Sequence, residues 1–471
     1  MTTPRATDAL IVGAVKLLTS ALVLAQGFRA VSDDDYARIA IAQRFAEAPS
    51  LDPSGTSWLP LPFWVYGGAF SLFGSGLEVA RVTALLLGVA AAVAVLVAAQ
   101  WLGAGRLGAL FAAVVASAFP WSAWLGAAAL PEAPTAGLIV LGIASLSESN
   151  VRRRSLGAFA LAVACFSRYE AWPVAFVFLV LTAIDARRLR SWGLAVPAVV
   201  AVLPIALWLA HGAVRHDDAL FFWKRVAAYK AALGETRADA GAFEPLVAFV
   251  REAFLLVLLT CVSLVLRIRS GGIRSLAPYA RGAACSAALV AFLSAGAVGG
   301  AAPTHHFARA LLPVWYFLAL VLGHGAEPSL AVRRQRPGFV GVILILFTLL
   351  LTKPLPGDFA HRDLELHIGS QAHRLGAPAL LVDTSDFGYF AISAAFRKPN
   401  ATAPVDDHDP RTKRPQDAFA SLETLRTRLA GAAHAWLVTT NAHAELASEL
   451  GAVRARNPRF TLVEPDRRSP R

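Results

Sequence analysis

Long apolar runs separated by short polar segments dominate the chain up to residue 352. Counted at about 20 residues per membrane crossing, the runs predict eleven spanning helices, at 8–28, 81–101, 107–127, 132–149, 155–167, 170–185, 192–210, 246–266, 278–297, 307–324 and 338–352. The 471 residues are 56% hydrophobic and 16% charged. Because a soluble domain has roughly 25% charged residues, the sequence predicts an α-helical polytopic membrane protein.

Arginine clusters indicate the orientation of these spans, because loops rich in Lys and Arg stay on the cytoplasmic side. Four clusters occupy four separate loops, at 152–154, 187–190, 267–274 and 333–336. They share one side only if eleven spans are counted with the N-terminus in the cytoplasm. We therefore expect a multi-pass protein of the bacterial inner membrane, with an uncleaved first segment as signal anchor and an extracytoplasmic C-terminal region.

The segment "PLPFWVYGGAFSLFG", at 60–74, is apolar but short, and it opens with Pro60 and Pro62. A twelfth span here would place the later basic clusters on the opposite side of the membrane. The pattern therefore predicts a juxtamembrane helix within the first external loop, 29–80.

The composition changes after Lys353-Pro354, where the chain becomes more charged. Short β-type runs at 379–383, 435–440 and 460–463 alternate with helical patterns at 421–432 and 442–456. Strands alternating with helices are typical of α/β domains. We expect a transmembrane module at 1–356, followed by a small soluble extracytoplasmic α/β domain at 357–471.

Polar side chains that hydropathy does not explain fall at the outer boundary of this topology. They are Asp33, Asp34, Asp35, Trp58, Glu132, Arg168, Tyr169, Glu170, His305, His306 and Arg309. A transporter or flippase of lipid-linked saccharides would place charges or broken helices near the bilayer midplane. The pattern instead favours an enzyme that acts where lipid headgroups lie. A non-catalytic envelope scaffold is the third alternative, and it would leave the aspartates expendable.

Several of these segments, in this order, resemble the GT-C superfamily of glycosyltransferases, which includes protein O-mannosyltransferases and lipid A aminoarabinose transferases. The similarity covers roughly residues 8–352. It consists of the acidic triplet before Tyr36-Ala37, an aromatic helix ending in Phe73-Gly74, Ala80-Arg81 at the start of a span, Glu132 after two further spans, "FSRYEAWPVAF" at 166–176 and "HHFARALLPVW" at 305–315. In the last segment, Phe307 and Ala308 depart from the order of residues that is usual in the family.

This resemblance implies a GT-C-like membrane fold with its site at the outer face. The family uses a polyprenyl-phosphate-linked sugar as donor, and an acid in its first loop is the catalytic base. The expected reaction is an inverting hexosyl or pentosyl transfer to a lipid, glycan or protein acceptor among the membrane lipids. No nucleic-acid partner is expected.

The chemistry of such a transfer asks for the same residue types. An aspartate with like-charged neighbours can accept the proton of the attacking hydroxyl. We assign this role to Asp34, with Asp33, Asp35 and Glu132 completing the catalytic acids. Asp33, Asp35 and Glu132 could alternatively hold Mg²⁺ or Mn²⁺, and the resemblance leaves the need for a metal open.

Basic side chains would stabilise the departing phosphate through charge-assisted hydrogen bonds. The candidates are Arg168, Arg309, His305 and His306, and the acceptor or sugar would contact Trp58, Tyr36 and Glu170. Each assignment has a simpler alternative. The aspartates could be a solvated flank of the first span, and Glu132 could be a helix-initiating acid favoured by the helix dipole.

Overall fold

The computed structural model describes residues 5–147, 150–232, 241–298, 307–332, 336–383, 387–405, 418–432 and 434–466. The described chain forms two compact units. The first comprises Met1–Phe28, Gly55–Leu61 and Ala84–Leu355, and the second comprises Arg29–Ser54, Pro62–Thr83 and Pro356–Arg471. The second unit therefore combines most of the first loop with the C-terminal region, whereas the sequence analysis had grouped that loop with the membrane spans.

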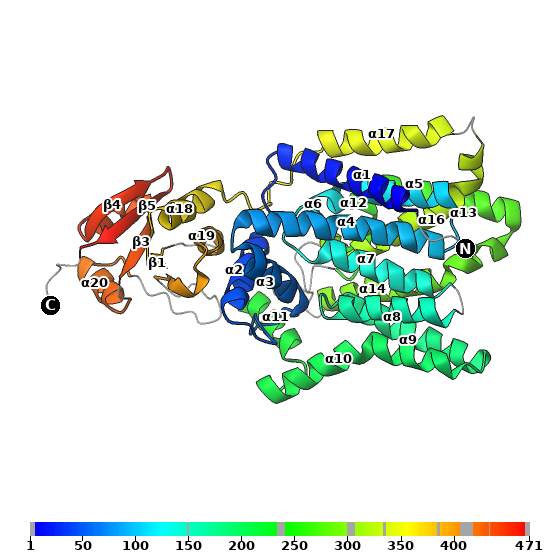
Figure 1. Cartoon of the computed structure of the whole chain (residues 1–471), viewed down its shortest axis with the longest axis horizontal. Helices are drawn as coiled ribbons and strands as arrows, with labels where there is room; N and C mark the ends of the chain where they lie inside the picture. The colour runs from blue at the N-terminus through cyan, green and yellow to red at the C-terminus, as the bar shows by residue number, and fades with distance from the viewer. Residues whose placement is uncertain are drawn as a thin grey trace. The chain divides into compact units, whose positions relative to one another are not determined.

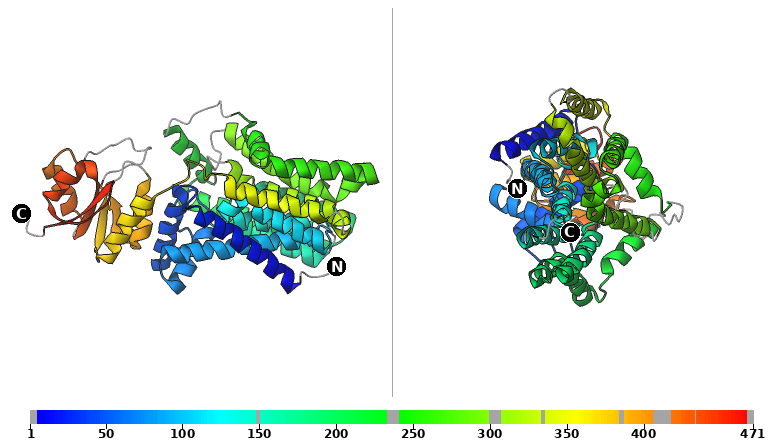
Figure 2. Two further views of the ribbon diagram at one scale, coloured as in Figure 1. Left: turned by 90° about the horizontal axis from the view of Figure 1, so that it is seen from above. Right: turned by 90° about the vertical axis from the view of Figure 1, so that its right-hand side faces the viewer.

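The helices of the first unit run side by side in Figure 1 and are seen end-on at the right of Figure 2. Among the described residues as far as Thr352, the two units together contain a series of α-helices. They are α1 (Ala6–Ala25), α2 (Asp33–Glu47), α3 (Leu61–Phe73), α4 (Leu77–Trp101), α5 (Arg106–Ala118), α6 (Pro120–Leu125), α7 (Glu132–Ser145), α8 (Val151–Cys165), α9 (Ala171–Arg188), α10 (Ala195–His216), α11 (Phe221–Ala232), α12 (Glu244–Glu252), α13 (Phe254–Gly271), α14 (Ala277–Val298), α15 (Phe307–Ala310), α16 (Leu312–Ala331) and α17 (Arg336–Thr352).

Among the described residues, five helical segments are long and apolar enough to cross a membrane. They are Ala6–Ala25, Leu77–Trp101, Trp192–His216, Phe254–Gly271 and Ile273–Val298. Shorter apolar helices lie at Leu61–Phe73, Arg106–Ala118, Glu132–Ser145 and Pro337–Thr352. The prediction of a helical polytopic membrane protein is confirmed, and the total of eleven spans stays a prediction. The helix predicted at 60–74 is also present, as α3.

One predicted span, 107–127, is interrupted. Phe119 has an extended backbone (ψ 130°) between α5 and α6 because it precedes Pro120, and a residue before proline is disfavoured in the helical region. The chain therefore turns at this point and continues as the short helix α6. This turn places Ser122 beside a buried residue of α1.

That residue is Lys16, which the sequence analysis overlooked and whose side chain is about 1% exposed. Its ammonium donates to the Ser122 carbonyl at 2.5 Å, and the Ser122 hydroxyl lies 2.8 Å from that of Tyr316. The polar residues selected from the sequence all lie at the predicted outer boundary, whereas Lys16 lies within the apolar helix α1. The hydrogen bond from the Lys16 ammonium to a backbone carbonyl limits the free-energy cost of burying this side chain.

A second buried charge comes from the basic cluster at 152–154. Arg154 is fully buried in α8 and donates to Asp185 at 3.0 Å and to Thr182 at 2.9 Å. Asp185 also accepts from Arg281, with both contacts at 2.6 Å. This cluster therefore joins α8, α9 and α14, and one of its three arginines is a packing residue rather than a loop charge.

Replacing Asp185 with asparagine should destabilise the first unit. Arg154 would keep its position but lose the opposite charge, and breaking a buried ion pair on one side typically costs about 3 kcal/mol or more. Thermal unfolding of the protein in nanodiscs would measure the loss. The matched control is Asp218→Asn, at a pair with Lys224 whose lysine side chain is largely exposed. An unchanged melting temperature in Asp185→Asn would contradict the structural role.

The C-terminal part of the second unit contains the predicted α/β fold. Its elements are α18 (Asp363–Arg374), β1 (Ala379–Val382), α19 (Gly388–Phe396), β2 (Thr402–Pro404), α20 (Leu422–Ala430), β3 (Ala435–Thr440), α21 (Ala444–Ser448), β4 (Gly451–Arg456) and β5 (Phe460–Pro465). The five strands form one sheet in the order β2-β1-β3-β5-β4. β1 is parallel to β2 and β3, and β5 is antiparallel to β3 and β4.

Both faces of this sheet are covered (Figure 1). Leu380 and Val382 point to one face and pack with α18 and α19, and Leu381 and Leu437 point to the other and pack with α20 and α21. The strands predicted at 379–383, 435–440 and 460–463 are confirmed as β1, β3 and β5. The helix predicted over 442–456 is wrong after Ser448, because Gly451–Arg456 pairs with β5 as β4.

The first loop packs on this domain within the same unit, through contacts between α2 and α19. Gln43 of α2 donates to the Ala394 carbonyl at 2.9 Å, and Arg397 pairs with Glu78 at 3.2 Å. Gly67 of α3 lies against Phe45, where an added Cβ would overlap the ring. The predicted boundary at 356 stays a prediction, but α2 packs with the region beyond it and α3 packs on α2.

Candidate active site

The acidic triplet begins α2, and each aspartate has its own surroundings. Asp35 is buried and its carboxylate accepts hydrogen bonds from the backbone N–H groups of Val31 and Ser32, at 3.2 and 3.3 Å. These bonds cap the helix in the way that an acid at the third position usually does. Asp35 therefore fixes the start of α2.

Asp33 lies in an ion pair with the C-terminal domain. Arg362, just before α18, holds both carboxylate oxygens of Asp33 at 2.8 Å. Arg362 also reaches Glu365 at 3.2 Å, and Glu365 accepts from Arg459 at 2.6 Å. The two residues of the Asp33–Arg362 pair are 329 positions apart in sequence, so no local pattern could have indicated the contact.

Asp34 lies between these two structural acids and is half-buried. Tyr36 follows on the same helix and is almost fully buried. Burial, together with the charge of Asp35, raises the pKa of Tyr36, so its hydroxyl keeps its proton at neutral pH. Among the described residues this hydroxyl has no hydrogen-bond partner. A buried hydroxyl of this kind usually acquires a partner, which a bound ligand could provide.

The first unit brings a second set of candidates together around Glu132. This residue starts α7, and its carboxylate accepts from Arg168 at 2.5 Å and from Arg309 at 2.8 Å. The exposed fractions of the three residues are 2%, 9% and 4%. Arg168 lies in the turn between α8 and α9, and Arg309 lies in α15. Three segments that the sequence analysis singled out separately therefore meet at one buried point.

Glu170 completes this cluster. Both of its oxygens accept from Arg168, at 2.9 and 2.5 Å, so the guanidinium lies between two carboxylates. With two arginines and two glutamates the cluster has no net charge. A bidentate guanidinium–carboxylate pair has a fixed geometry, and Glu170 thereby orients Arg168 while Glu132 bridges both arginines.

An aromatic cluster anchors the same turn to the segment that contains Trp58. The Tyr169 hydroxyl donates to the Ser57 carbonyl at 2.7 Å and receives the indole N–H of Trp208 at 3.1 Å. Leu61 donates its backbone N–H to the Phe166 carbonyl at 3.1 Å. Trp58 itself is half-buried. These bonds place Trp58 on a segment that is fixed to the Arg168 turn.

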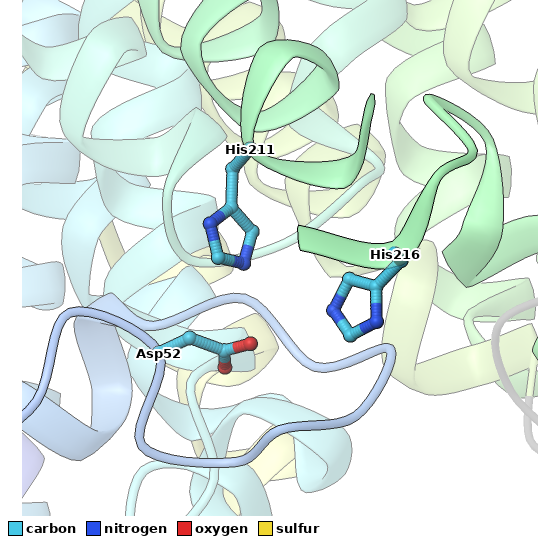
Figure 3. Close-up of side chains that lie close together, drawn as sticks. All are labelled: Asp52, His211 and His216. Atoms are coloured by element: carbon cyan, nitrogen blue, oxygen red, sulfur yellow. The ribbon is translucent and has the colours of Figure 1, made fainter. Parts of the chain in front are cut away.

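The predicted histidines, His305 and His306, lie outside the described residues. Two other imidazoles, missed by the sequence analysis, lie near the end of α10 (Figure 3). The rings of His211 and His216 are 5.8 Å apart, and His216 stacks on Phe221 at 4.0 Å. Histidine spacing of i, i+5 on an apolar helix gives no recognised motif, so the sequence offered no signal for them. Asp52, also drawn in Figure 3, belongs to the second unit.

The surroundings of the proposed metal ligands can be tested against a divalent cation. Glu132 already faces two guanidinium groups, and their positive charge would oppose a cation there. At Asp33 a cation would have to replace Arg362, and the Asp35 carboxylate is engaged in capping. The described residues therefore fit Mg²⁺ or Mn²⁺ poorly at Asp33, Asp35 and Glu132, and no step of the mechanism below uses a metal.

No family model and no curated protein matches this sequence. Solved structures do match. ArnT from Cupriavidus metallidurans bound to undecaprenyl phosphate aligns over 99% of this chain and 100% of its own, with a TM-score of 0.68 and 17% identity. Apo ArnT from the same organism aligns over 95% and 97%, with a TM-score of 0.57 and 17% identity.

The chain has the ArnT fold. ArnT is a lipid A aminoarabinose transferase of the GT-C superfamily, which is the resemblance that the sequence motifs indicated. The likeness extends over nearly the whole of both chains, so it includes the C-terminal domain as well as the apolar helices. At 17% identity the likeness is one of fold.

Replacing Arg362 with glutamine should lower the turnover of the protein by about tenfold or less. In this variant the negative charge of Asp33 is no longer balanced by Arg362, and this charge changes the electrostatic environment of the neighbouring Asp34, the proposed base. Turnover as a function of pH in purified Arg362→Gln would show the effect as a displaced profile. The control is Asp363→Asn, which removes the exposed pair with Arg29. If both variants keep the wild-type profile, Arg362 does not influence the triplet.

Proposed function

We propose that this protein is a membrane glycosyltransferase that transfers a sugar from a polyprenyl-phosphate donor to a lipid, glycan or protein acceptor. The observation that carries the proposal is the fold of ArnT bound to undecaprenyl phosphate, which this chain matches over nearly its full length. The neutral, buried cluster around Glu132 and the acidic start of α2 supply the two kinds of group that such a transfer requires.

In the proposed reaction the acceptor hydroxyl loses its proton to Asp34 as its oxygen attacks the anomeric carbon. The bond from that carbon to the phosphate oxygen breaks, and the polyprenyl phosphate departs with the electron pair. Attack opposite to the leaving group inverts the configuration of the sugar. General-base assistance of this kind typically contributes about 10²–10⁴ in rate.

Arg168 and Arg309 are the proposed partners of the departing phosphate, because guanidinium groups form short bidentate bonds to phosphate oxygens. Glu132 and Glu170 keep both arginines oriented in the absence of ligand. A group that is positioned in advance needs little reorganisation when charge develops on the leaving oxygen. Tyr36 and Trp58 are the proposed contacts for the sugar or the acceptor.

The proposed location is the bacterial inner membrane, with a cytoplasmic N-terminus and the acidic triplet and C-terminal domain outside. This orientation follows from the basic loops. Reporters fused near residues 152, 188, 270 and 334 should therefore report the cytoplasm, and one near 360 the exterior. A cytoplasmic C-terminus would contradict the location of the site.

A transporter of lipid-linked saccharides is the second candidate, and the buried Lys16 is the observation that favours it. Ionisable groups within membrane helices often mark substrate pathways. However, the Lys16 ammonium lies against Gly126, where an added Cβ would approach it to 2.4 Å. This close packing on the backbone favours a structural role.

The test uses purified protein in nanodiscs with synthetic undecaprenyl-phosphate hexoses and pentoses. Mass spectrometry would detect released undecaprenyl phosphate and the glycosylated product, and lipid extracts of cells with and without the protein would identify the acceptor. Transfer from at least one donor is the expected result. Movement of the donor between leaflets without cleavage would identify a transporter. Neither transfer nor movement would leave the scaffold as the remaining interpretation.

A further inference from the structure

The sheet of the C-terminal domain changes direction at β1. The chain passes from β1 to β2 on one side and then crosses to β3 on the other, and both neighbours are parallel to β1. The connecting helices α19 and α20 cover opposite faces of the sheet. In open sheets of this kind a crevice forms where the strand order reverses, at the carboxyl ends of the strands, and ligands commonly bind there.

Polar side chains meet at the carboxyl ends of β1 and β3, where this topology predicts such a crevice. Asp383 directly follows β1, and one of its carboxylate oxygens, Oδ2, accepts from the Thr439 hydroxyl at 3.0 Å, the Thr440 N–H at 3.3 Å and the Thr440 hydroxyl at 3.4 Å. His443, in the turn after β3, lies with Nδ1 3.1 Å from the same oxygen. The ends of β1 and β3 thus supply an Asp–His pair that is fixed by hydrogen bonds.

The pair leaves two acceptor atoms at the crevice. Asp383 holds the proton of His443 on Nδ1, because a carboxylate selects the tautomer that donates to it. Nε2 of His443 is then an acceptor, and the side chain is 42% exposed. Oδ1 of Asp383 receives no hydrogen bond from the described residues. The imidazole stacks on Phe419, with ring centroids 4.4 Å apart, and this contact fixes the direction of Nε2.

The charge of the crevice limits the class of ligand. Among the described residues, His443 is the one ion-pair partner of Asp383, and the site therefore disfavours phosphate and other anions. Among the described residues the pair offers one carboxylate and one imidazole nitrogen, fewer than the three or four protein ligands of a usual zinc site. Two neighbouring acceptors instead match a ligand that offers two adjacent hydroxyl groups.

We propose that this crevice binds the vicinal hydroxyl groups of a saccharide, with Asp383 Oδ1 and His443 Nε2 as acceptors. The binding itself is independent of the transfer reaction. Its use for holding a glycan acceptor rests on the proposed function. The site would give the C-terminal domain a role in saccharide recognition, although this domain is far from the acidic triplet in sequence.

The experiment uses the full-length protein in lipid nanodiscs, because maltoside detergents would themselves occupy a sugar site. Saturation-transfer NMR would be recorded with the methyl glycosides of mannose, galactose and glucosamine, with AMP as a ribose diol and with inorganic phosphate. Calorimetry with Zn²⁺ and Mn²⁺ would test for a metal. Binding of at least one methyl glycoside is the expected result.

His443→Phe keeps a ring that can stack on Phe419 but removes the acceptor nitrogen. It should weaken glycoside binding about tenfold, as expected for the loss of one hydrogen bond. His367→Phe, at an exposed position of α18, is the matched control and should bind as the wild type does. Thr440→Val keeps the backbone N–H and should weaken glycoside binding less than His443→Phe does. It is the second test variant, to be used if His443→Phe fails to fold.

Three outcomes would overturn the proposal: neither a methyl glycoside nor AMP binds, His443→Phe binds as tightly as His367→Phe, or only phosphate or a metal ion binds. Undecaprenyl-phosphate binding and transfer, measured on the same preparations, keep this result separate from the proposed function. Loss of glycoside binding with intact donor cleavage would concern the crevice alone. Absence of transfer in the wild type, with glycosides still bound, would concern the reaction alone.

Discussion

Replacing Asp34 with asparagine should reduce sugar transfer by about 10²–10⁴, the usual contribution of a general base. The amide has the size of the carboxylate and keeps one hydrogen-bond acceptor, but it cannot take the proton of the attacking hydroxyl. Because Asp35 forms the cap of α2 and Asp33 forms the bidentate contact with Arg362, both contacts remain in this variant and the fold should be retained. The measurement is turnover of an undecaprenyl-phosphate sugar by purified protein, with undecaprenyl-phosphate affinity determined alongside.

The neighbouring aspartates provide matched controls. Asp33→Asn loses its charge beside Arg362 and should lower activity less, and Asp35→Asn should mainly weaken the start of α2, by about 1 kcal/mol for a lost helix cap. If one of these variants loses more activity than Asp34→Asn while its melting temperature is unchanged, the base has been assigned to the wrong residue. Full turnover in all three would show that the triplet has a structural role only.

The apolar periodicity of the sequence was sufficient to predict the class of the fold, because spanning helices need long uninterrupted hydrophobic runs. It was less informative about where helices end. The run at 107–127 is continuous in hydropathy, yet its backbone is extended at Phe119 before Pro120. Lys16 was missed for a related reason, since a single charge barely changes the mean hydropathy of a 20-residue window.

In the C-terminal domain, β-branched and aliphatic runs were sufficient to locate β1, β3 and β5, which are the buried strands. β4 was predicted as helix because it lies at the edge of the sheet, where four of its six residues are exposed and alternation is weak. Its pairing with β5 decides its structure, and pairing is a tertiary effect that overrides local propensity. The polar residues at the ends of β1 and β3 can be recognised as one cluster only once those strands are known to be adjacent.

The candidate site shows the same limit. Glu132, Arg168 and Arg309 were each selected for being polar at a predicted outer boundary, and in the structure they meet. Their roles toward one another were not predictable, because Arg309 is 177 positions from Glu132. Both arginines were expected to be available for phosphate. In the structure Glu132 bridges them, and Glu170, expected to contact sugar, holds Arg168.

Glu132→Gln should therefore separate phosphate binding from catalysis. The change removes one of two negative charges that balance Arg168 and Arg309, so the cluster gains a net positive charge. Undecaprenyl phosphate should bind at least as tightly as it does to the wild type, because its phosphate meets a more positive site. Transfer should fall by about 10² or more, as the arginines lose the orientation that serves the departing phosphate. Affinity and turnover, measured on the same sample, give the two halves of this prediction.

Stability provides the necessary control, because an uncompensated buried arginine typically costs about 3–5 kcal/mol. Glu132→Asp keeps the charge and should recover most of the melting temperature, whereas its shorter side chain cannot bridge both guanidiniums and should leave transfer low. Glu170→Gln removes the bidentate partner of Arg168 but leaves Glu132 in place, and it should affect turnover less than Glu132→Gln. If Glu132→Gln loses phosphate affinity and turnover together while remaining folded, the glutamate itself contacts the donor, and the assignment of the phosphate to the two arginines is wrong.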